Sequence, residues 1–458
     1  MPERLRTGTA AALLAALLSA PLPGAAQEAV TVAVQDARLA LMQLAAGTGR
    51  SQSGLLDAAS RAIYLQDGSA TLSELDAAAD EAGSLDAMTA GANGTVTAHR
   101  PIVVLQGAEL RLDPGDRLAL DRRAGAFVLS LGATVFDGAE VAVTGGRHPR
   151  VDGFRPFIAG LGETSLTLQD TTFTGLGYNA ESTTSGVSLV GGGLLASGTA
   201  APVTGNTFEN LRTVSLSELD TLEVTGNRVT EARGSGLRIR SVREARIQDN
   251  LVARPHGAEA LHASGLARAT ISGNRFEAGQ GKGVRIDDAS RELRFTGNRV
   301  AGFDGSGVTL AEGAECVLLA QNEVADNRGS GISVRDAGTF ILSGNEVRDN
   351  MGPGIGVIAQ ADGSEGLILR NVFSGNRQGI RATRVTRLRL AENDLSKQMP
   401  RLFGGDLDQH TPGWLKDRRA DGATSMVLEE AAARTDAALR RNAAADAYAA
   451  CSQTEGGV

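Results

Sequence analysis

The sequence predicts an all-β fold, a right-handed parallel β-helix, in which each repeat of the chain forms one coil of a solenoid. Three observations lead to this prediction. An asparagine returns every 21–26 residues, two apolar columns keep step with it, and glycine-rich turns separate short strands. The chain has 458 residues, of which 58 are glycine and only 3% are aromatic. Such a composition is typical of many tight turns and unusual for a compact α/β enzyme.

The repeat carries the motif TGN, or a close variant of it, from about residue 200 onward. An apolar residue lies three positions before each of these asparagines, and another lies two positions after it. Coils of such a solenoid stack about 4.8 Å apart, so each column forms a ladder. We expect the asparagines to form a structural ladder in a turn, to adopt left-handed backbone and to bond the neighbouring coil through their amides. They are Asn206, Asn227, Asn250, Asn274, Asn298, Asn322, Asn345, Asn371 and Asn393.

Each coil also contains a second apolar strand that opens with glycine, as in GSGLRI, GKGVRI and GSGISV. Residues 101–146 alternate apolar and polar side chains with the same turn chemistry, so we expect the solenoid to span residues 99–400. Residues 27–98, with the helical pattern LSELDAAADEA, fit a small N-terminal cap over the open end of the stack. Residues 401–458 are expected to form a linker and a helical tail, with the helix running from about Met426 to Cys451.

The N-terminus has the features of an export signal. Arg4 and Arg6 are positive, residues 10–18 form an apolar run too short to span a bilayer, and residues 24–26 are small. We therefore expect residues 1–26 to be a signal peptide, and the mature protein to have no membrane span and to be periplasmic or secreted. Cys316 and Cys451 are far apart in the sequence, so we expect no disulfide framework and no functional role for either.

Charge and composition exclude several kinds of partner. The formal net charge is -8, which argues against nucleic acid as a ligand. No cluster of Cys, His or Met suits a transition metal, and the Gly- and Asp-rich nonapeptide of calcium-binding β-rolls is missing. We expect a monomer without a metal and without an organic cofactor.

Several stretches resemble, in order along the chain, the periplasmic mannuronan C5-epimerase family of bacterial alginate synthesis. They are RPIVVLQGAELRLD, RAGAFVLSLGATVFDGAEVAVTG, FRPFIAGLGETSLTLQDTTFTGLGYNA and the asparagine coils, with FRPF and LGYNA the most specific. The resemblance covers about residues 60–395. It implies a β-helix, export to the periplasm, and proton transfer at C5 of a uronate within a polymer.

That chemistry needs a cation beside the uronate carboxylate, a base on one face of the sugar and an acid on the other. The family carries it on a coil reading G-I-D-P-H-D, in which the His is the expected base. The matching coil here, residues 236–241, reads GLRIRS, so Arg240 stands in the place of the His. Arg keeps its proton near neutral pH and cannot act as the base. The motif D-P-H-D occurs nowhere else in the sequence, and Gly265 stands where the family has an arginine on the next coil.

Strand alternation places Leu237 and Ile239 inward, and therefore places arginines outward on the same strand. Seven arginines face only three acidic residues between residues 228 and 254, which is a local excess of positive charge. Arginine forks bind carboxylates, and the coil spacing roughly matches that of an extended sugar chain. The alternative is that these arginines are solvated ladder charges partnered by nearby Asp and Glu. The candidate substrate-binding residues are Arg155, Arg238, Arg240, Arg285 and Arg335.

Two residues are candidates for a relocated catalytic base. His262 follows Arg238 in the outward column, and histidine is the side chain able to work as a base near pH 7. Tyr178 lies in the family-like segment LGYNA, as Arg155 lies in FRPF. The alternatives are that His262 is an ordinary surface histidine and that Tyr178 and Arg155 serve packing or structural hydrogen bonding.

Three functions follow from these residues. The favoured one is an exported, non-catalytic β-helix that binds or handles an acidic, uronate-type polysaccharide, with a polysaccharide synthesis or export complex as a further candidate partner. The second is an active polysaccharide C5-epimerase, an isomerase, or a lyase that uses His262 or Tyr178. The third is a periplasmic accessory β-helix that assists metal-enzyme maturation, against which the lack of a metal-ligand cluster argues.

Overall fold

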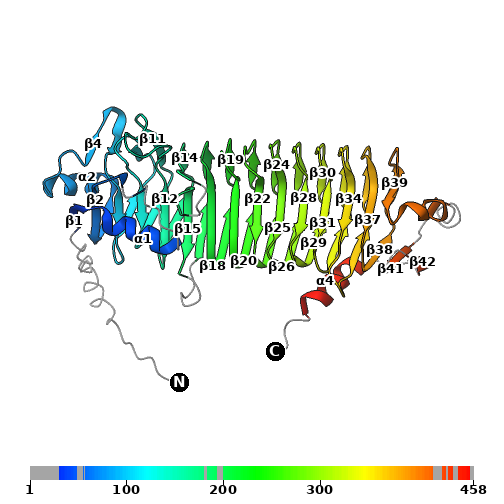
Figure 1. Cartoon of the computed structure of the whole chain (residues 1–458). Helices are drawn as coiled ribbons and strands as arrows, with labels where there is room; N and C mark the ends of the chain where they lie inside the picture. The colour runs from blue at the N-terminus through cyan, green and yellow to red at the C-terminus, as the bar shows by residue number, and fades with distance from the viewer. Residues whose placement is uncertain are drawn as a thin grey trace, which may run out of the picture.

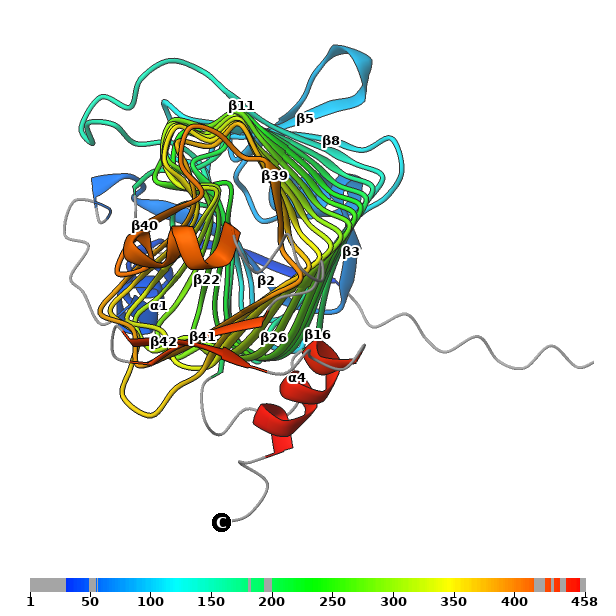
Figure 2. The ribbon, with the colours of Figure 1, turned by 90° about the vertical axis from the view of Figure 1, so that its right-hand side faces the viewer.

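The computed structural model describes residues 30–48, 55, 57–179, 183–192, 200–415, 425–429, 432–436 and 442–453. The expected signal peptide, residues 1–26, lies outside these residues. Figure 1 shows a long stack of parallel coils with the described N-terminal elements at one end and the C-terminal elements at the other. Figure 2 looks along the stack, where successive coils superimpose around a common interior. The predicted all-β solenoid with an N-terminal cap is confirmed, and the C-terminal tail contains a helix, although a shorter one than expected.

Three walls of parallel strands enclose the interior. The first wall faces the viewer in Figure 1. It consists of β2 (Arg61–Asp67), β6 (Ile102–Val104), β9 (Val128–Ser130), β12 (Ile158–Gly162), β15 (Gly186–Gly191), the first halves of β18 (Thr213–Thr225) and β20 (Leu237–Gln248), β22 (Glu259–Ser264), β25 (Lys282–Asp287), β28 (Val308–Ala311), β31 (Ile332–Arg335), β34 (Pro353–Ile358), β37 (Gln378–Thr383) and β40 (Phe403–Gly405).

The second wall continues from the first, because β18 and β20 run through the corner between them. Its other strands are β3 (Ser69–Thr71), β7 (Glu109–Leu112), β10 (Ala133–Asp137), β13 (Ser165–Gln169), β16 (Ala200–Thr204), β23 (Ala267–Ser272), β26 (Arg291–Thr296), β29 (Glu315–Ala320), β32 (Phe340–Ser343), β35 (Gly366–Leu369) and β38 (Arg387–Ala391).

The third wall is made of short strands that form a separate sheet. They are β4 (Met88–Ala90), β5 (Thr95–Ala98), β8 (Arg117–Asp121), β11 (Glu140–Thr144), β14 (Thr172–Thr174), β17 (Thr207–Glu209), β19 (Arg228–Thr230), β21 (Leu251–Ala253), β24 (Arg275–Glu277), β27 (Arg299–Ala301), β30 (Glu323–Ala325), β33 (Glu346–Arg348), β36 (Val372–Ser374) and β39 (Asp394–Lys397).

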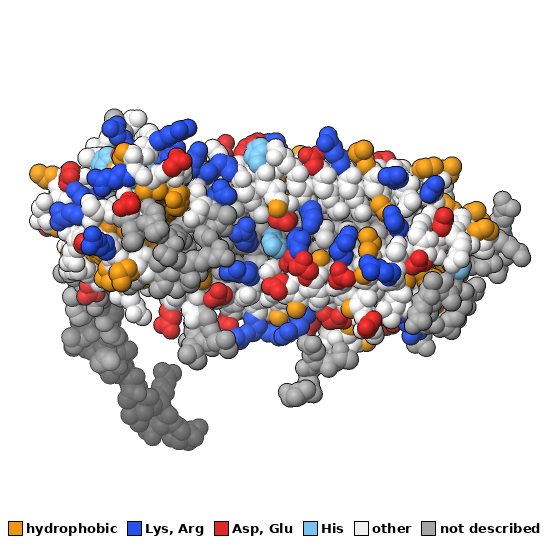
Figure 3. Space-filling view, viewed as in Figure 1, with side chains coloured by type: hydrophobic (Ala, Val, Ile, Leu, Met, Phe, Trp, Pro, Cys, Tyr) orange, Lys and Arg blue, Asp and Glu red, His pale blue; other side chains and the backbone are white. Residues whose placement is uncertain are grey.

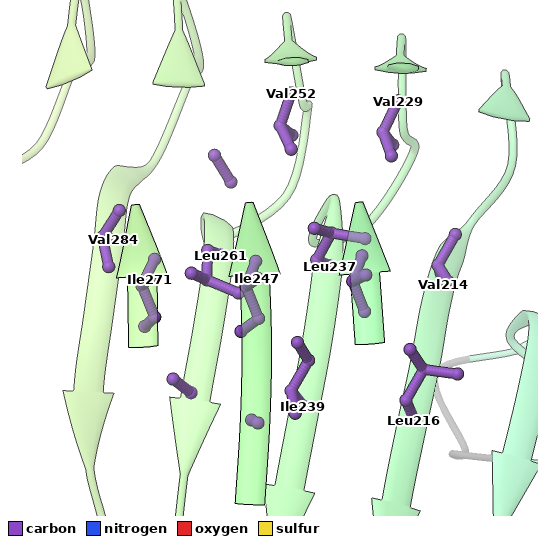
Figure 4. Packing of buried hydrophobic residues seen from close by; sticks show 14 of the residues in the cluster. Val214, Leu216, Val229, Leu237, Ile239, Ile247, Val252, Leu261, Ile271 and Val284 are labelled. Atoms are coloured by element: carbon purple, nitrogen blue, oxygen red, sulfur yellow. The ribbon is translucent and has the colours of Figure 1, made fainter. Parts of the chain in front are cut away.

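The interior is filled by apolar side chains that stack from coil to coil. Figure 4 shows Leu237 and Leu261 as neighbours on the first wall, and Val229 and Val252 as neighbours on the third. Both apolar columns predicted around the repeated asparagine are buried, and so are Leu237 and Ile239. Because each strand presents the same face inward, the opposite side chains of the first wall form an outward surface of fixed register.

The nine repeated asparagines form the predicted buried ladder between the second and third walls. Asn298 is representative: its Nδ2 donates to Ile271 O at 2.9 Å and to Asn322 Oδ1 at 3.1 Å. Its Oδ1 accepts from the backbone N and the Nδ2 of Asn274, both at 2.9 Å. The expectation of left-handed backbone at these asparagines is wrong. The positive φ belongs to the residue before each of them, for example 64° at Gly297, because the amide must point inward to reach the next coil.

A second asparagine ladder, which the sequence did not suggest to us, lies between the third and first walls. Asn327 Nδ2 donates to Asn350 Oδ1, and Asn350 Nδ2 donates to Asn376 Oδ1, both at 2.9 Å. The ladder ends where Asn376 Nδ2 donates to Gln398 Oε1 at 3.0 Å. It spans only the C-terminal coils, so its repeat is too short to stand out in the sequence.

The N-terminal cap combines a strand and two helices. β1 (Thr31–Asp36) pairs antiparallel with β2, and α1 (Arg38–Thr48) lies in front of the first wall near its N-terminal end (Figure 1). The predicted helix is α2 (Leu72–Glu81), which begins with a capping box between Thr71 and Glu74. β2 and β3 already stack in parallel on β6 and β7, so coil-like pairing reaches back before the expected start at residue 99.

The C-terminal segment differs from the single helix expected between Met426 and Cys451. β41 (Ser425–Glu429) and β42 (Ala432–Asp436) form an antiparallel hairpin on β38, and only α4 (Ala443–Gln453) is helical. Met426 and Leu428 are buried on the end of the core, so covering the last coil outweighs the helical propensity of this Ala-rich segment. Before the hairpin, the short helix η4 (Asp408–His410) precedes Trp414, which packs edge-on against Phe403.

The two cysteines, from which we expected no disulfide framework, form a single long-range disulfide. Cys316 on β29 and Cys451 on α4 are bonded, with their Cα atoms 5.6 Å apart and 135 residues between them in sequence. The helix α4 folds back along the outside of the second wall, where Tyr448 is buried and Arg294 lies over its ring at 4.6 Å. In the described part of the chain no helix is long and apolar enough to cross a membrane.

Replacing Asn298 by Ala should lower the free energy of unfolding by about 2 to 3 kcal/mol, because the change leaves buried backbone and amide groups of two neighbouring coils without partners. The half-exposed Thr296 on the same coil provides a matched control, and Thr296→Ala should change the stability by a few tenths of a kcal/mol at most. Denaturant unfolding followed by circular dichroism measures both. An equal midpoint for the two variants would contradict the structural role of the ladder.

Candidate functional site

The outward column predicted through Arg238 is present on the first wall. Arg238 on β20 pairs in register with His262 on β22, and His262 pairs with Arg285 on β25. The column then continues through Thr309, Ser333, Gly356 and Arg381 on the strands that follow. Figure 3 shows this wall face-on, with basic, acidic and histidine side chains along its middle. The sequence period thus places a histidine between two arginines, one coil apart on either side.

His262 and Arg285 share one buried carboxylate. His262 Nε2 lies 3.1 Å from Asp287 Oδ1, and Arg285 Nε donates to Asp287 Oδ2. Arg285 also donates from Nη2 to Glu312 Oε1 at 2.7 Å. The side chain of Asp287 is only 4% exposed, whereas that of His262 is 27% exposed. This geometry fixes the imidazole of His262 and leaves part of its ring at the surface.

The charges of this group stabilise one another. Burial alone would raise the pKa of Asp287, but the hydrogen bonds from His262 and Arg285 outweigh burial and hold the pKa below its ordinary value. The hydrogen bond to Asp287 in turn raises the pKa of the Arg285 guanidinium. Asp287 is therefore an ionised carboxylate at neutral pH, and Arg285 is engaged by two acidic residues.

Arg240 and Arg335 lie in the neighbouring outward column. Arg240 is exposed and pairs in register with Ser264, the last residue of β22. Arg335 is also exposed and lies on β31, beside Ala311 on β28. Both arginines belong to the first wall, but β22, β25 and β28 lie between the strand of Arg240 and the strand of Arg335.

Tyr178 and Arg155 lie elsewhere, in turns between the third and first walls near the N-terminal end. Tyr178 is half-buried, its ring lies 5.6 Å from that of Phe154, and its N–H donates to Thr184 O at 2.8 Å. Arg155 donates from Nη1 to Gly175 O at 3.5 Å. Strands β18 and β20 lie between β15, which follows Tyr178, and β22, which carries His262. The structure therefore does not bring the two candidate bases together.

Three further arginines near Arg155 were missed in the sequence. Arg122, Arg212 and Arg233 lie in turns of the same corner, each just before a strand of the first wall. Together with Arg155 they form what we call the arginine corner. The intervals between them in the sequence are irregular, so no period reveals them. Asp287 was also missed as a partner of His262, although its place two residues after Arg285 on the same strand puts both side chains outward.

The described residues contain no candidate metal site. Within residues 30–48, 55, 57–179, 183–192, 200–415 and the three short C-terminal stretches, no three His, Cys, Asp or Glu side chains group in a way that could hold a metal ion.

The shared carboxylate gives a pH-dependent prediction. Because the pKa of Asp287 is lowered on folding, its contribution to stability is present above the ordinary carboxyl pKa and is lost as the pH falls through the lowered pKa. Asp287→Asn should therefore lower the free energy of unfolding by about 2 kcal/mol at neutral pH, and by much less at an acidic pH below the lowered pKa. Denaturant unfolding at both pH values measures this. Asp336→Asn, at a turn with no hydrogen bond to a histidine, is the control; a difference that does not shrink in acid would contradict the assignment.

Comparison with known proteins agrees with this architecture. Two solved structures, of the periplasmic alginate epimerase AlgG and of a double mutant of it, superpose with a TM-score of 0.64 at 18% sequence identity; 88% of this chain is covered, together with 99% and 98% of theirs. No curated protein matches the sequence. The family model described as the right-handed beta helix region matches residues 158–300 and again residues 259–405. With more than half of its length matched, the chain belongs to the right-handed beta helix family.

Proposed function

We propose that this protein is an exported β-helix protein that binds or handles an acidic, uronate-type polysaccharide along its first wall. The observation that carries the proposal is the direct register of Arg238, His262 and Arg285 on adjacent strands. Neighbouring coils lie about 4.8 Å apart, close to the rise of one sugar in an extended chain, so one coil can meet one sugar. The likeness in fold to a periplasmic alginate epimerase supports the same class of ligand.

Charge along the wall supports binding of carboxylates. Arg240 is exposed on the strand that carries Arg238, and its fork can bind a carboxylate in two-point fashion. Arg285 forms ion pairs with Asp287 and Glu312, so its guanidinium is already occupied. It therefore adds to the positive electrostatic potential of the wall rather than binding a ligand carboxylate in two-point fashion. The column continues through the buried Thr309 to the half-exposed Ser333, whose hydroxyl can offer a hydrogen bond to a sugar hydroxyl. The binding surface we propose is therefore strongest at β20 and β22.

A second candidate function, an active C5-epimerase or lyase, is favoured by the hydrogen bond between His262 and Asp287. A carboxylate that accepts the proton of one imidazole nitrogen leaves the other nitrogen as a base. Arg238 in the adjacent position would neutralise the uronate carboxylate while C5 loses its proton. Tyr178 suits this role less, because its ring packs against Phe154.

Export and domain organisation belong to the same proposal. The disulfide between Cys316 and Cys451 is typical of an oxidising compartment, which supports the periplasm or secretion after removal of residues 1–26. We keep residues 27–98 as the cap region, 99–400 as the solenoid and 401–458 as the C-terminal region. We propose a monomer that works alone or with a polysaccharide synthesis or export complex.

Binding is tested by proton NMR of oligomannuronate and other oligouronates mixed with the mature protein. We expect the sugar signals to broaden, and we expect Arg238→Ala combined with Arg240→Ala to abolish the broadening. Arg246→Ala is the matched control, because Arg246 lies on the same strand but faces outward from the second wall, beside Thr270. Broadening that survives the double substitution, or is absent from the unaltered protein with every uronate, would contradict the proposal.

The same samples in deuterated water separate binding from catalysis. Deuterium entering at C5 would establish proton transfer, and His262→Gln should then abolish the exchange while leaving the broadening. His256→Gln is the control, because His256 lies in a turn and bonds the exposed Glu231. Exchange that persists in His262→Gln would exclude His262 as the base.

A further inference from the structure

The arginine corner gathers four guanidinium groups from turns that are neighbours in the stack. Arg122 precedes β9, Arg155 precedes β12, Arg212 precedes β18 and Arg233 precedes β20. The turn before β15, Gly175–Gly177, lies in the middle of this series. Figure 3 shows basic side chains gathered over the N-terminal part of this face. The corner thus spans five coils at the N-terminal end of the surface that we propose for the polysaccharide.

Backbone carbonyl groups hold two of these arginines toward the same point. Arg233 donates from Nη2 to Leu176 O at 2.8 Å and to Gly177 O at 3.1 Å, and from Nε to Asn210 O at 3.2 Å. Arg155 approaches the neighbouring Gly175 O at 3.5 Å. These bonds fix the guanidinium groups without neutralising their charge, because a carbonyl carries only a partial charge.

Glycine at position 177 makes room for the third arginine. Its φ is 113°, and a Cβ built there would lie 2.6 Å from the Cβ of Arg212, so only glycine fits beside that side chain. Arg122 completes the group: its Nε donates to Phe154 O at 2.5 Å, the residue next to Arg155. All four side chains are half-buried.

The guanidinium groups of the corner form no ion pair in the described residues, although Asp152 lies near enough to act on Arg122. None of these four arginines pairs with an Asp or Glu anywhere in the described residues, whereas Arg285, Arg299 and Arg348 of later coils all do. Burial, and then the charges of its three arginine neighbours, lower the pKa of Arg233 to about 10. Burial and the charge of Arg155 also lower the pKa of Arg122, against the opposing effect of Asp152. Four like charges held together in this way favour a bound anion.

We propose that the arginine corner is a binding subsite for an oxyanion carried by the polysaccharide, a uronate carboxylate or an ester sulfate or phosphate. The identity of the polymer rests on the proposed function, whereas the anion site rests on the corner itself. Arg233 and Arg238 belong to the same coil, so a chain anchored at the corner leads directly onto the column of Arg238 and His262. The corner sets where along the stack the polymer begins to bind.

Calorimetric titration with a long oligouronate tests this subsite. Arg155→Ala combined with Arg212→Ala should weaken binding about tenfold or more, because two charge-assisted contacts are lost. These two are chosen because Arg233 and Arg122 also tie turns together. The control removes the same charge from two neighbouring loops: Arg123→Ala with Arg150→Ala, two exposed arginines, should change the affinity less than twofold. Arg155→Lys with Arg212→Lys keeps the charge and should bind with intermediate affinity, which also guards against a folding defect.

The outcomes separate the two proposals. If Arg155→Ala with Arg212→Ala weakens binding and the variant of Arg238 and Arg240 does not, the subsite is supported and the first wall is contradicted as the main binding surface. Weakening by Arg238→Ala with Arg240→Ala alone overturns the subsite and leaves the proposed function standing. Titration with a sulfated polysaccharide and with inorganic phosphate identifies the oxyanion; if phosphate alone binds as tightly as any polymer and the polymers do not displace it, the corner is an anion site unrelated to the polysaccharide, and our inference is wrong.

Discussion

The parallel register between coils is the constraint on which every other feature of this protein depends. Each strand pairs with the strand one coil away, so a side chain can face only the residue in the same column. Inward columns must be apolar along the whole stack, and one substitution there disturbs two neighbours. Outward columns carry no such restriction, so the side chain in one outward column can change from Arg238 to His262 to Arg285 on successive coils. The inward residues beside them, Leu237, Leu261 and Val284, are all apolar and buried.

The buried amides reinforce that register. An asparagine such as Asn298 satisfies its own side chain and a backbone N–H of the previous coil, so it joins three coils by hydrogen bonds. Apolar packing alone would tolerate a small slip between coils, whereas these bonds would not. The left-handed residue that precedes each asparagine, such as Gly297 or Asp249, supplies the turn that aims the amide inward.

The sequence alone predicted the structural features that recur in every coil, and it missed the features that occur only once. The coils, the inward columns and the line from Arg238 to Arg381 follow from one period, because stacking makes sequence spacing equivalent to spatial position. The hairpin β41–β42 and the disulfide lie outside the period, where tertiary packing on the last coils overrides local propensity. The arginine corner was missed for a similar reason: turns differ in length, so residues such as Arg155 and Arg212 meet in space without a constant interval. Asp287 was missed as a partner because its bond to His262 depends on side-chain directions that a period does not give.

The disulfide alters how the stack can come apart. Solenoids fray from their ends, because a terminal coil has a neighbour on one side only. The bond ties β29, in the body of the stack, to a helix that follows the last coil, so β31 to β40 lie inside a covalent loop. Unravelling from that end would have to open the loop as a whole and could not proceed one coil at a time. Fraying is thereby directed to the N-terminal end, where β1, α1 and α2 cover the first coil without a covalent link.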